Sequence, residues 1–160
     1  MKSQSIHIVD VGTWKGEGLG VFPTIKSFEF IEHLVFKKEE ERSVIHYEQI
    51  TWLKPSSLHK KKSSHWESGF ISFENKEQFF MNNVHVNGRM ECLNLNEIKM
   101  SKDSCQFLFE SRLIINDERM QNSKREWNFD DGKLNYEMFM GTTTVKKQQL
   151  HLSACLIKEI

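Results

Sequence analysis

Hydrophobic and polar residues alternate along most of this chain in short runs, and turn-forming residues separate one run from the next. Strict alternation is typical of β-strands with one buried face, whereas a helix repeats its apolar positions every three to four residues. The chain shows no convincing helical stripe of that kind. The pattern predicts strands at Gly12–Phe22, Phe28–Lys37, Ser43–Leu53, Ser64–Phe73, Glu77–His85, Arg89–Leu95, Cys105–Leu113, Met120–Phe129, Lys133–Thr142 and Val145–Ile157.

Two of the predicted connections contain the dipeptides Asn87-Gly88 and Asp131-Gly132. Both pairs accept the positive φ that a tight turn between antiparallel strands requires, so strands adjacent in sequence are expected to be adjacent in the sheet. Such a meander leaves two exposed edges unless the sheet closes on itself. We therefore predict an all-β fold, a single antiparallel up-and-down β-barrel of about ten strands, with a two-sheet sandwich as the alternative.

The size and composition of the chain fit one folded unit. A length of 160 residues suits a single domain covering residues 1–160, and 38% hydrophobic with 28% charged residues is ordinary for a globular protein. A barrel of about ten strands is wider than the eight-stranded kind that side chains just fill. The sequence therefore predicts an internal cavity, which is its first indication of function.

The charge balance argues against two classes of partner. Lysine plus arginine equals aspartate plus glutamate, so no net field attracts nucleic acid or an anionic membrane. The run Lys60, Lys61, Lys62 lies among serines and a proline, which favours a solvated loop over a basic binding patch. An interaction module that uses this lysine loop to meet an acidic partner is a third, weaker hypothesis, and the sequence leaves open whether the loop gates a pocket.

The cysteines and the apolar segments bear on the cellular compartment. Cys92, Cys105 and Cys155 are far apart and show no CxxC spacing, which favours buried free thiols in a reducing compartment. No segment approaches the ~20 apolar residues of a membrane-spanning helix, and the first residues lack the apolar core of a signal peptide. We expect a cytoplasmic protein with no membrane partner, while a nuclear location remains open.

The first predicted strand carries glycine at every second position from Gly12 to Gly20, except that Trp14 takes one of these places. By the two-residue period of a strand, these residues share one face. Glycine weakens a strand because it has no side chain to pack. Either the glycines let the strand curve sharply at a barrel corner, or they keep the interior clear for a large ligand, and the two explanations are compatible.

Several segments, taken together, resemble the nitrobindin family. The stretch GTWKGEG at 12–18 followed by FPTI at 22–25 is similar to its GxWxGxG and YPTI motifs. The segments QITW at 49–52 and HWESGF at 65–70 resemble the next two motifs, and DGKLNY at 131–136, MGTT at 140–143 and HLSACL at 151–156 resemble the closing ones. The match runs in order over almost the whole chain.

The resemblance implies a barrel of the lipocalin and fatty-acid-binding-protein type that binds heme b, as in the C-terminal domain of THAP-type nitrobindins. It implies that His151 is the axial ligand of the heme iron. It further implies roles for four residues around the heme: His65 on the open side of the iron, Met140 in the pocket wall, Thr24 beside the porphyrin, and Lys133 as a weaker candidate for a propionate contact.

Considered without the resemblance, the two histidines have plainer explanations. Leu150, Leu152, Ala154 and Leu156 form the apolar face of the last strand, and unbroken alternation points His151 away from it. A polar place inside the lumen, or an apolar contact on the barrel exterior, would resolve this conflict. His65 shares a face with Glu67, which could orient the ring or raise its pKa, or the pair could lie on an exposed strand face.

The resemblance leads to a specific functional hypothesis and one rival. The expected activity is that of a ferric heme enzyme, a peroxynitrite isomerase that forms nitrate, with His151 and His65 as catalytic residues and nitric oxide as a further ligand of the iron. A homodimer is compatible with the family. The alternative is a carrier that holds a lipid or another small hydrophobic ligand in the same barrel without heme, although no interior Arg-x-Tyr triplet typical of fatty-acid carriers occurs.

Overall fold

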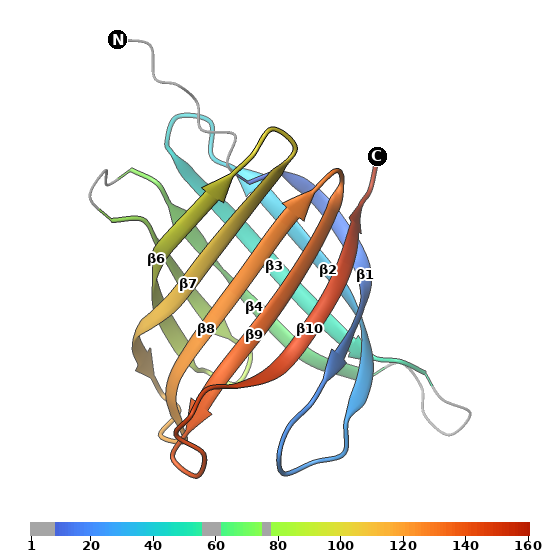
Figure 1. The fold of residues 1–160 in the computed structure, drawn as a ribbon, viewed down its shortest axis with the longest axis vertical. Helices are drawn as coiled ribbons and strands as arrows, with labels where there is room; N and C mark the ends of the chain where they lie inside the picture. The colour runs from blue at the N-terminus through green and yellow to red at the C-terminus, as the bar shows by residue number, and fades with distance from the viewer. Residues whose placement is uncertain (1–8, 56–61, 75–77) are drawn as a thin grey trace.

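The computed structural model of the protein describes residues 9–55, 62–74 and 78–160. These described residues contain no helix and form ten β-strands that wind obliquely around one axis (Figure 1). The strands are β1 (Gly12–Gly20), β2 (Phe28–Lys38), β3 (Val44–Leu53), β4 (Lys62–Ser72), β5 (Phe80–His85), β6 (Met90–Met100), β7 (Ser104–Ile115), β8 (Met120–Asp130), β9 (Lys133–Thr142) and β10 (Gln149–Lys158).

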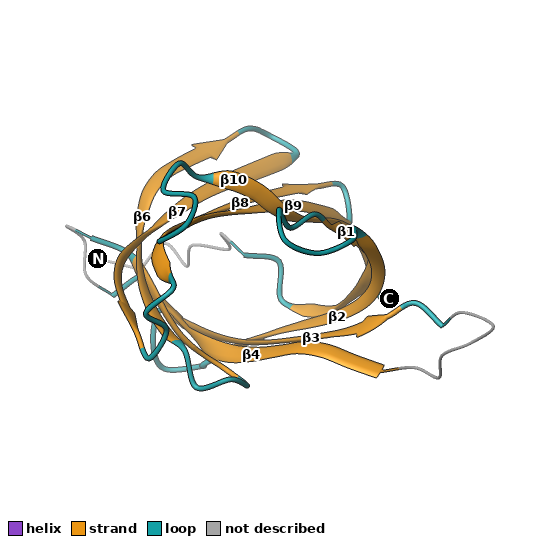
Figure 2. Ribbon diagram, turned by 90° about the horizontal axis from the view of Figure 1, so that it is seen from below, coloured by secondary structure: helices purple, strands orange, loops and turns teal. Residues whose placement is uncertain are grey.

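Each strand pairs antiparallel with its neighbours in sequence, and β1 also pairs with β10, so the sheet closes into a barrel (Figure 2). The predicted closed meander is confirmed and the sandwich is wrong. Most strand boundaries differ from the prediction by a few residues, and the two largest differences are that β6 continues to Met100 and β10 begins only at Gln149. The expected start of the fifth strand, Glu77, lies outside the described residues, as do Lys60 and Lys61.

Aromatic side chains fill the end of the barrel at which β1 begins and β10 ends (Figure 1). Trp14 meets Phe129 edge to face with ring centroids 5.4 Å apart, and Phe36 contacts both Phe129 and Trp127 at 5.9 Å and 5.5 Å. Such pairs add stability beyond the burial of apolar area. This end of the barrel is therefore solid core.

A belt of buried polar side chains crosses the middle of the barrel. Its members are Glu32, Tyr47, Gln49, Glu67, Asn83, His85, Glu91, Arg125 and Tyr136. Together with the aromatic end, the belt occupies most of the lumen. The internal cavity that the number of strands predicts is consequently reduced to hollows near the opposite end of the barrel. These hollows are shallower than the cavity that a barrel of this width could enclose.

The glycines of β1 make room for the barrel's own atoms. A Cβ added at Gly16 would lie 2.8 Å from Cα of Leu156 on β10, closer than real Cβ atoms approach. A Cβ at Gly18 would collide with the ring of Phe30, and one at Gly20 with the ring of Phe28. The bare face thus allows close pairing with β10 and accommodates two phenylalanine rings.

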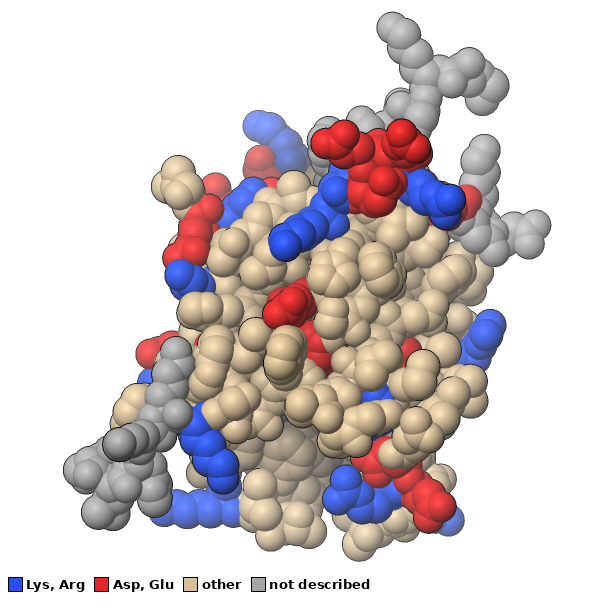
Figure 3. Space-filling view, turned by 180° about the vertical axis from the view of Figure 1, so that it is seen from behind, with Lys and Arg blue, Asp and Glu red and all other residues tan. Residues whose placement is uncertain are grey.

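The outer surface carries mixed charge. The face seen in Figure 3 has acidic and basic side chains close together at both ends of the barrel, and few charges between them. All three cysteines are free, but Cys155 is exposed and the other two are half-buried, so the prediction of buried thiols is wrong. No helix among the described residues is long and apolar enough to cross a membrane.

Candidate functional site

The mouth of the barrel lies at the lower end in Figure 1, where the β1–β2, β5–β6, β7–β8 and β9–β10 connections meet. It contains an inner hollow of about 180 Å³ and an outer hollow of about 270 Å³. The inner hollow is lined by residues that include Phe22, Phe28, Gln49, Thr51, His65, Arg89, Met138 and Met140. The outer hollow is lined by residues that include Phe22, Thr24, Arg89, Asp117, Met140, Thr142 and His151.

A β-bulge places His151 in this mouth. On β10, Leu150 pairs with Phe139 and Leu152 pairs with Met138, so His151 is an extra residue between two paired positions. Bulges of this kind re-aim a side chain and are common next to binding sites. His151 is buried whereas Leu150 is exposed, so the expectation from unbroken alternation, that His151 points away from the core, is wrong.

The hydrogen bond at the other ring nitrogen determines what His151 can bind. Its Nδ1 lies 2.8 Å from the carbonyl oxygen of Gln149. Because a carbonyl oxygen only accepts, Nδ1 carries the proton, and Nε2 of the neutral ring keeps a lone pair. Histidines that ligate metals usually have this arrangement, in which a backbone carbonyl orients the ring.

Phe22 stands between the two hollows. It lines both of them, and its ring packs edge-on against the His151 ring with centroids 4.8 Å apart. On its other side it stacks over Phe28 at 5.9 Å. Each hollow alone is smaller than the roughly 300–1,000 Å³ of ordinary small-molecule sites, whereas a space without this partition reaches that range.

The structure brings four of the five predicted site residues to the mouth. Thr24 and His151 line the outer hollow, His65 lines the inner one, and Met140 lines both. Lys133 does not join them, because it begins β9 whereas Met140 is near the end of that strand, roughly 23 Å away along an extended chain. It is exposed and lines neither hollow.

Glu67 is the centre of the polar belt. Arg125 donates to both of its carboxylate oxygens, Tyr47 donates to Oε1 at 2.8 Å, and Nε2 of His65 lies 3.0 Å from Oε2. Burial alone would raise the pKa of Glu67, but Arg125 and the hydrogen bond from His65 hold it well below its usual range. The carboxylate is therefore ionised and fully occupied as an acceptor.

Arg125 also links Glu67 to Glu91, since its Nη2 lies 2.7 Å from Oε2 of Glu91. Burial opposes the ionisation of Glu91, yet Arg125 lowers its pKa to about 2. His85 lies between the same two carboxylates, 3.2 Å from Glu67 and 3.3 Å from Glu91. Burial lowers the pKa of His85, which favours its neutral form.

Glu32 belongs to a separate hydrogen-bond cluster in the belt. Tyr136 and Nε2 of Gln49 each donate to it, the latter over 2.9 Å, and Gln49 reaches the inner hollow. Burial raises the pKa of Glu32 to about 8 even though these hydrogen bonds act in the opposite direction. A protonated carboxyl group thus lies next to a residue of the pocket wall at neutral pH.

Two residues of the belt, with His65 beside them, have the geometry of a metal site. One ligand atom each of His65, Glu67 and His85 lies within 4.8 Å of the others. A divalent cation there would have to share the Glu67 carboxylate with the Arg125 guanidinium, which already holds both oxygens. Arg125 therefore already supplies the positive charge that compensates the Glu67 carboxylate. The contacts of His65, Glu67 and His85 are explained without a metal.

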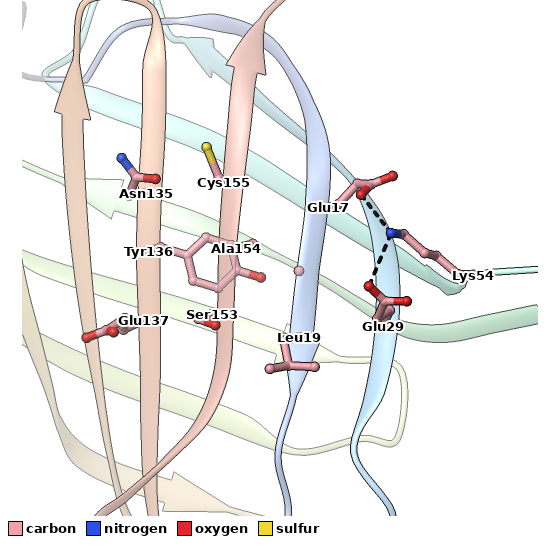
Figure 4. Close-up of a pocket in the computed structure, with 11 residues that line it drawn as sticks. Glu17, Leu19, Glu29, Lys54, Asn135, Tyr136, Glu137, Ser153, Ala154 and Cys155 are labelled. Atoms are coloured by element: carbon pink, nitrogen blue, oxygen red, sulfur yellow. Dashed lines mark hydrogen bonds and ion pairs between the residues drawn. The ribbon is translucent and has the colours of Figure 1, made fainter.

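A further depression, of about 510 Å³, lies on the outside of the barrel over β1, β9 and β10 (Figure 4). At its edge Lys54 pairs with Glu17 at 2.7 Å and with Glu29 at 3.4 Å. The depression is open and is lined by none of the predicted site residues. It is larger than either hollow of the mouth, but it offers no histidine and little enclosure.

Sequence patterns did not predict several residues around the site, namely Glu32, His85, Arg89, Glu91 and Arg125. The only signal was positional: Arg125 shares the inward face of β8 with Trp127 and Phe129, where a charged residue is unusual. His85 lacked any histidine neighbour in sequence and meets Glu67 only because β4 and β5 pair in that register.

Comparisons with known proteins identify the family and the fold. Residues 11–158 match the family model described as the THAP4-like, heme-binding beta-barrel domain. A protein of Arabidopsis thaliana named peroxynitrite isomerase Rv2717c is 32% identical over 148 residues, which cover 92% of this chain and 84% of that protein. The crystal structure of Rv2717c from M. tuberculosis superposes with a TM-score of 0.80 at 22% identity, over 94% of this chain and 92% of that one, and so supports the fold.

Proposed function

This chain belongs to the THAP4-like, heme-binding β-barrel family, and on that premise we propose that it binds heme b through His151 and isomerises peroxynitrite to nitrate. The observation that carries the proposal is the state of His151. The residue is buried at the mouth, its Nδ1 is tied to the Gln149 carbonyl, and its Nε2 is free to bind iron. The isomerase activity is taken from the name of the relative at 32% identity.

The lining of the mouth suits a flat apolar ring. Phe22, Phe28, Met138, Met140 and Leu152 supply apolar surface, and methionine adapts well to the face of a planar group. Thr24 adds a hydroxyl group from the β1–β2 connection. Heme held by His151 would supply an iron that can bind a small anion such as peroxynitrite, or nitric oxide.

The protein's own part in this reaction is to hold, orient and enclose. His151 fixes the iron, and the hydrophobic rings around it limit the entry of water. His65 is oriented by Glu67, and because that carboxylate only accepts, Nε2 of His65 carries the proton. In the neutral ring the remaining nitrogen is an acceptor, so His65 can receive a hydrogen bond from water or from a protonated ligand.

The rival proposal, a lipid carrier, receives less support from the interior. An alkyl chain needs a long apolar channel, whereas the polar belt and the aromatic rings occupy the lumen beyond the mouth. The Arg125 guanidinium with Glu67 and Glu91 crosses the path that such a chain would take. Heme at the mouth requires no such channel.

We also propose an intracellular homodimer. Trp66, Phe70 and Val84 project from β4 and β5 on the outside of the barrel and are about half exposed. A contiguous apolar patch of this kind is typical of protein contact surfaces. Analytical ultracentrifugation at micromolar concentration tests it, and a Phe70→Glu variant should sediment as a monomer, whereas wild-type protein that sediments as a monomer would contradict it.

The activity is tested by stopped-flow decay of peroxynitrite with the nitrate yield measured by ion chromatography. We expect the heme-loaded protein to accelerate decay and to raise the share of nitrate over nitrite. Heme-free protein and an equal amount of free hemin are the controls. A loaded protein no faster than free hemin would remove the isomerase proposal, and a protein that takes up a fluorescent fatty acid but no hemin would favour the carrier.

A further inference from the structure

Arg89 is a buried cation at the junction of the two hollows. It follows the Asn87-Gly88 turn and lines both the inner and the outer hollow. Its side chain is only 9% exposed. Its charge is unusual in a wall that is otherwise mostly apolar around Phe22 and Met140.

The guanidinium has more donors than acceptors around it. Nη2 donates to Nδ1 of His85 over 3.2 Å. Nε lies 3.5 Å from Oε1 of Glu91 and donates to no acceptor in hydrogen-bonding geometry among the described residues, and Nη1 lies 3.6 Å from Asp117, beyond hydrogen-bond length. Within the described part of the chain, this group with five N–H donors therefore makes one hydrogen bond.

Both neighbouring carboxylates are engaged by other arginines. Oε2 of Glu91 binds Arg125 at 2.7 Å, and Asp117 accepts Nε of Arg119 at 3.2 Å. They give Arg89 a compensating charge but few hydrogen bonds. A buried donor without an acceptor costs about 1–3 kcal/mol, so structures retain such groups mainly where something else supplies the acceptor.

We propose that Arg89 anchors a binding subsite for a small planar oxyanion of the nitrate type in the inner hollow, beside His65 and Met140. The planar fork of a guanidinium matches two oxygens of such an anion at once, which a lysine ammonium does not. The hollow of about 180 Å³ has room for several groups the size of a water molecule, which occupies about 30 Å³ in the liquid.

The subsite complements His65. His65 directs its Nε2–H at Glu67, so that proton is not available to an anion in the same hollow. Arg89 is the charged donor that remains on that wall. The inference rests on the proposed function only for the identity of the anion, because peroxynitrite and its product nitrate are both oxyanions. The subsite itself belongs to the heme-free barrel.

The test is a titration of the heme-free protein with sodium nitrate, at ionic strength held constant with sodium chloride, followed through backbone amide NMR shifts. We expect saturable shifts centred on Gly88 and Arg89. Arg89→Gln should weaken binding at least tenfold, and Arg89→Lys, which keeps the charge and the fold but loses the fork, should weaken it severalfold. Arg112→Gln removes an equal charge from an exposed position on β7 and should bind nitrate as wild type does.

Shifts that do not saturate, or that are the same in wild type and Arg89→Lys, would overturn the subsite.

A second titration distinguishes a free anion from a carboxylate of the porphyrin. If Arg89→Lys instead weakens hemin binding tenfold, and hemin dimethyl ester shows no such loss, Arg89 holds a propionate and the oxyanion subsite is wrong. Because nitrate binding is measured without heme, a failure of the isomerase proposal leaves this result unaffected.

Discussion

The backbone carbonyl of Gln149 accepts a hydrogen bond from Nδ1 of His151 over 2.8 Å. The contact spans two residues of β10 and is made possible by the bulge at His151. It fixes both the tautomer and the direction of the ring. It therefore leaves a single nitrogen, Nε2, for a metal.

His151→Ala should lose the histidine-ligated spectrum of the hemin complex and at least about tenfold of the hemin affinity, because the axial ligand is gone. Visible absorption titrations measure both. Added imidazole should restore the ligated spectrum if the variant is folded. His46→Ala is the matched control, since His46 lies on β3 and bonds to Ser68 outside the mouth. A Soret band that is identical in wild type and His151→Ala would contradict the assignment of His151 as the iron ligand.

Phe22→Ala should speed the association of hemin severalfold. Phe22 separates the two hollows and packs on His151, so it has to move before a large flat ligand enters, and binding that needs such a change is slow. Stopped-flow mixing with hemin measures the rate. Leu113→Ala, an exposed change on β7, should leave it as in wild type. If hemin associates no faster with Phe22→Ala than with wild type, the Phe22 ring is not a barrier to the entry of hemin.

Glu32 should make the free energy of unfolding depend on pH. Its pKa is about 8 in the folded barrel against an ordinary value of 4.5, so between these values the unfolded chain releases a proton that the folded chain keeps. The contribution of this group is fully present below about pH 4.5 and declines as pH rises to about 8, by ~1.4 kcal/mol for each pH unit.

Glu32→Gln should remove that decline, so its stability relative to wild type rises between pH 5 and pH 8, as roughly estimated from the same linkage. Urea unfolding at several pH values measures it. Glu29→Gln, exposed on the same strand, should keep the wild-type slope. Parallel slopes in wild type and Glu32→Gln would mean that Glu32 ionises normally in the folded protein.

Arg125→Met should cost about 3–5 kcal/mol, because it strands the carboxylates of Glu67 and Glu91 in the barrel without their partner. Lys124→Met, its neighbour on β8, removes an outward pair with Glu126 and should cost about 1 kcal/mol or less. Denaturant unfolding measures both.

Neutralising the two stranded acids in the triple variant Arg125→Met, Glu67→Gln, Glu91→Gln should recover most of the loss, since the penalty comes from unpaired buried charge. A triple variant as unstable as Arg125→Met alone would locate the cost in lost packing of the arginine side chain instead.

Local pattern determined the fold of this protein. Alternation along each run, the Asn87-Gly88 and Asp131-Gly132 turns and the absence of helical stripes were sufficient to predict a closed antiparallel barrel, because each of these signals acts within a few residues or between adjacent strands. The ordered motifs also identified His151, His65, Thr24 and Met140, all of which lie at the mouth.

Tertiary structure decided what these residues can do. Alternation assumes an unbroken register, so it could not place His151, whose direction depends on one extra residue in the pairing of β10 with β9. The polar belt is equally invisible in sequence, since Arg125 and Glu67 are 58 residues apart and meet only across the closed lumen. Whether a buried charge is paired, and whether a hollow is filled by Phe22 or left open, depends on contacts between distant strands that no local pattern encodes.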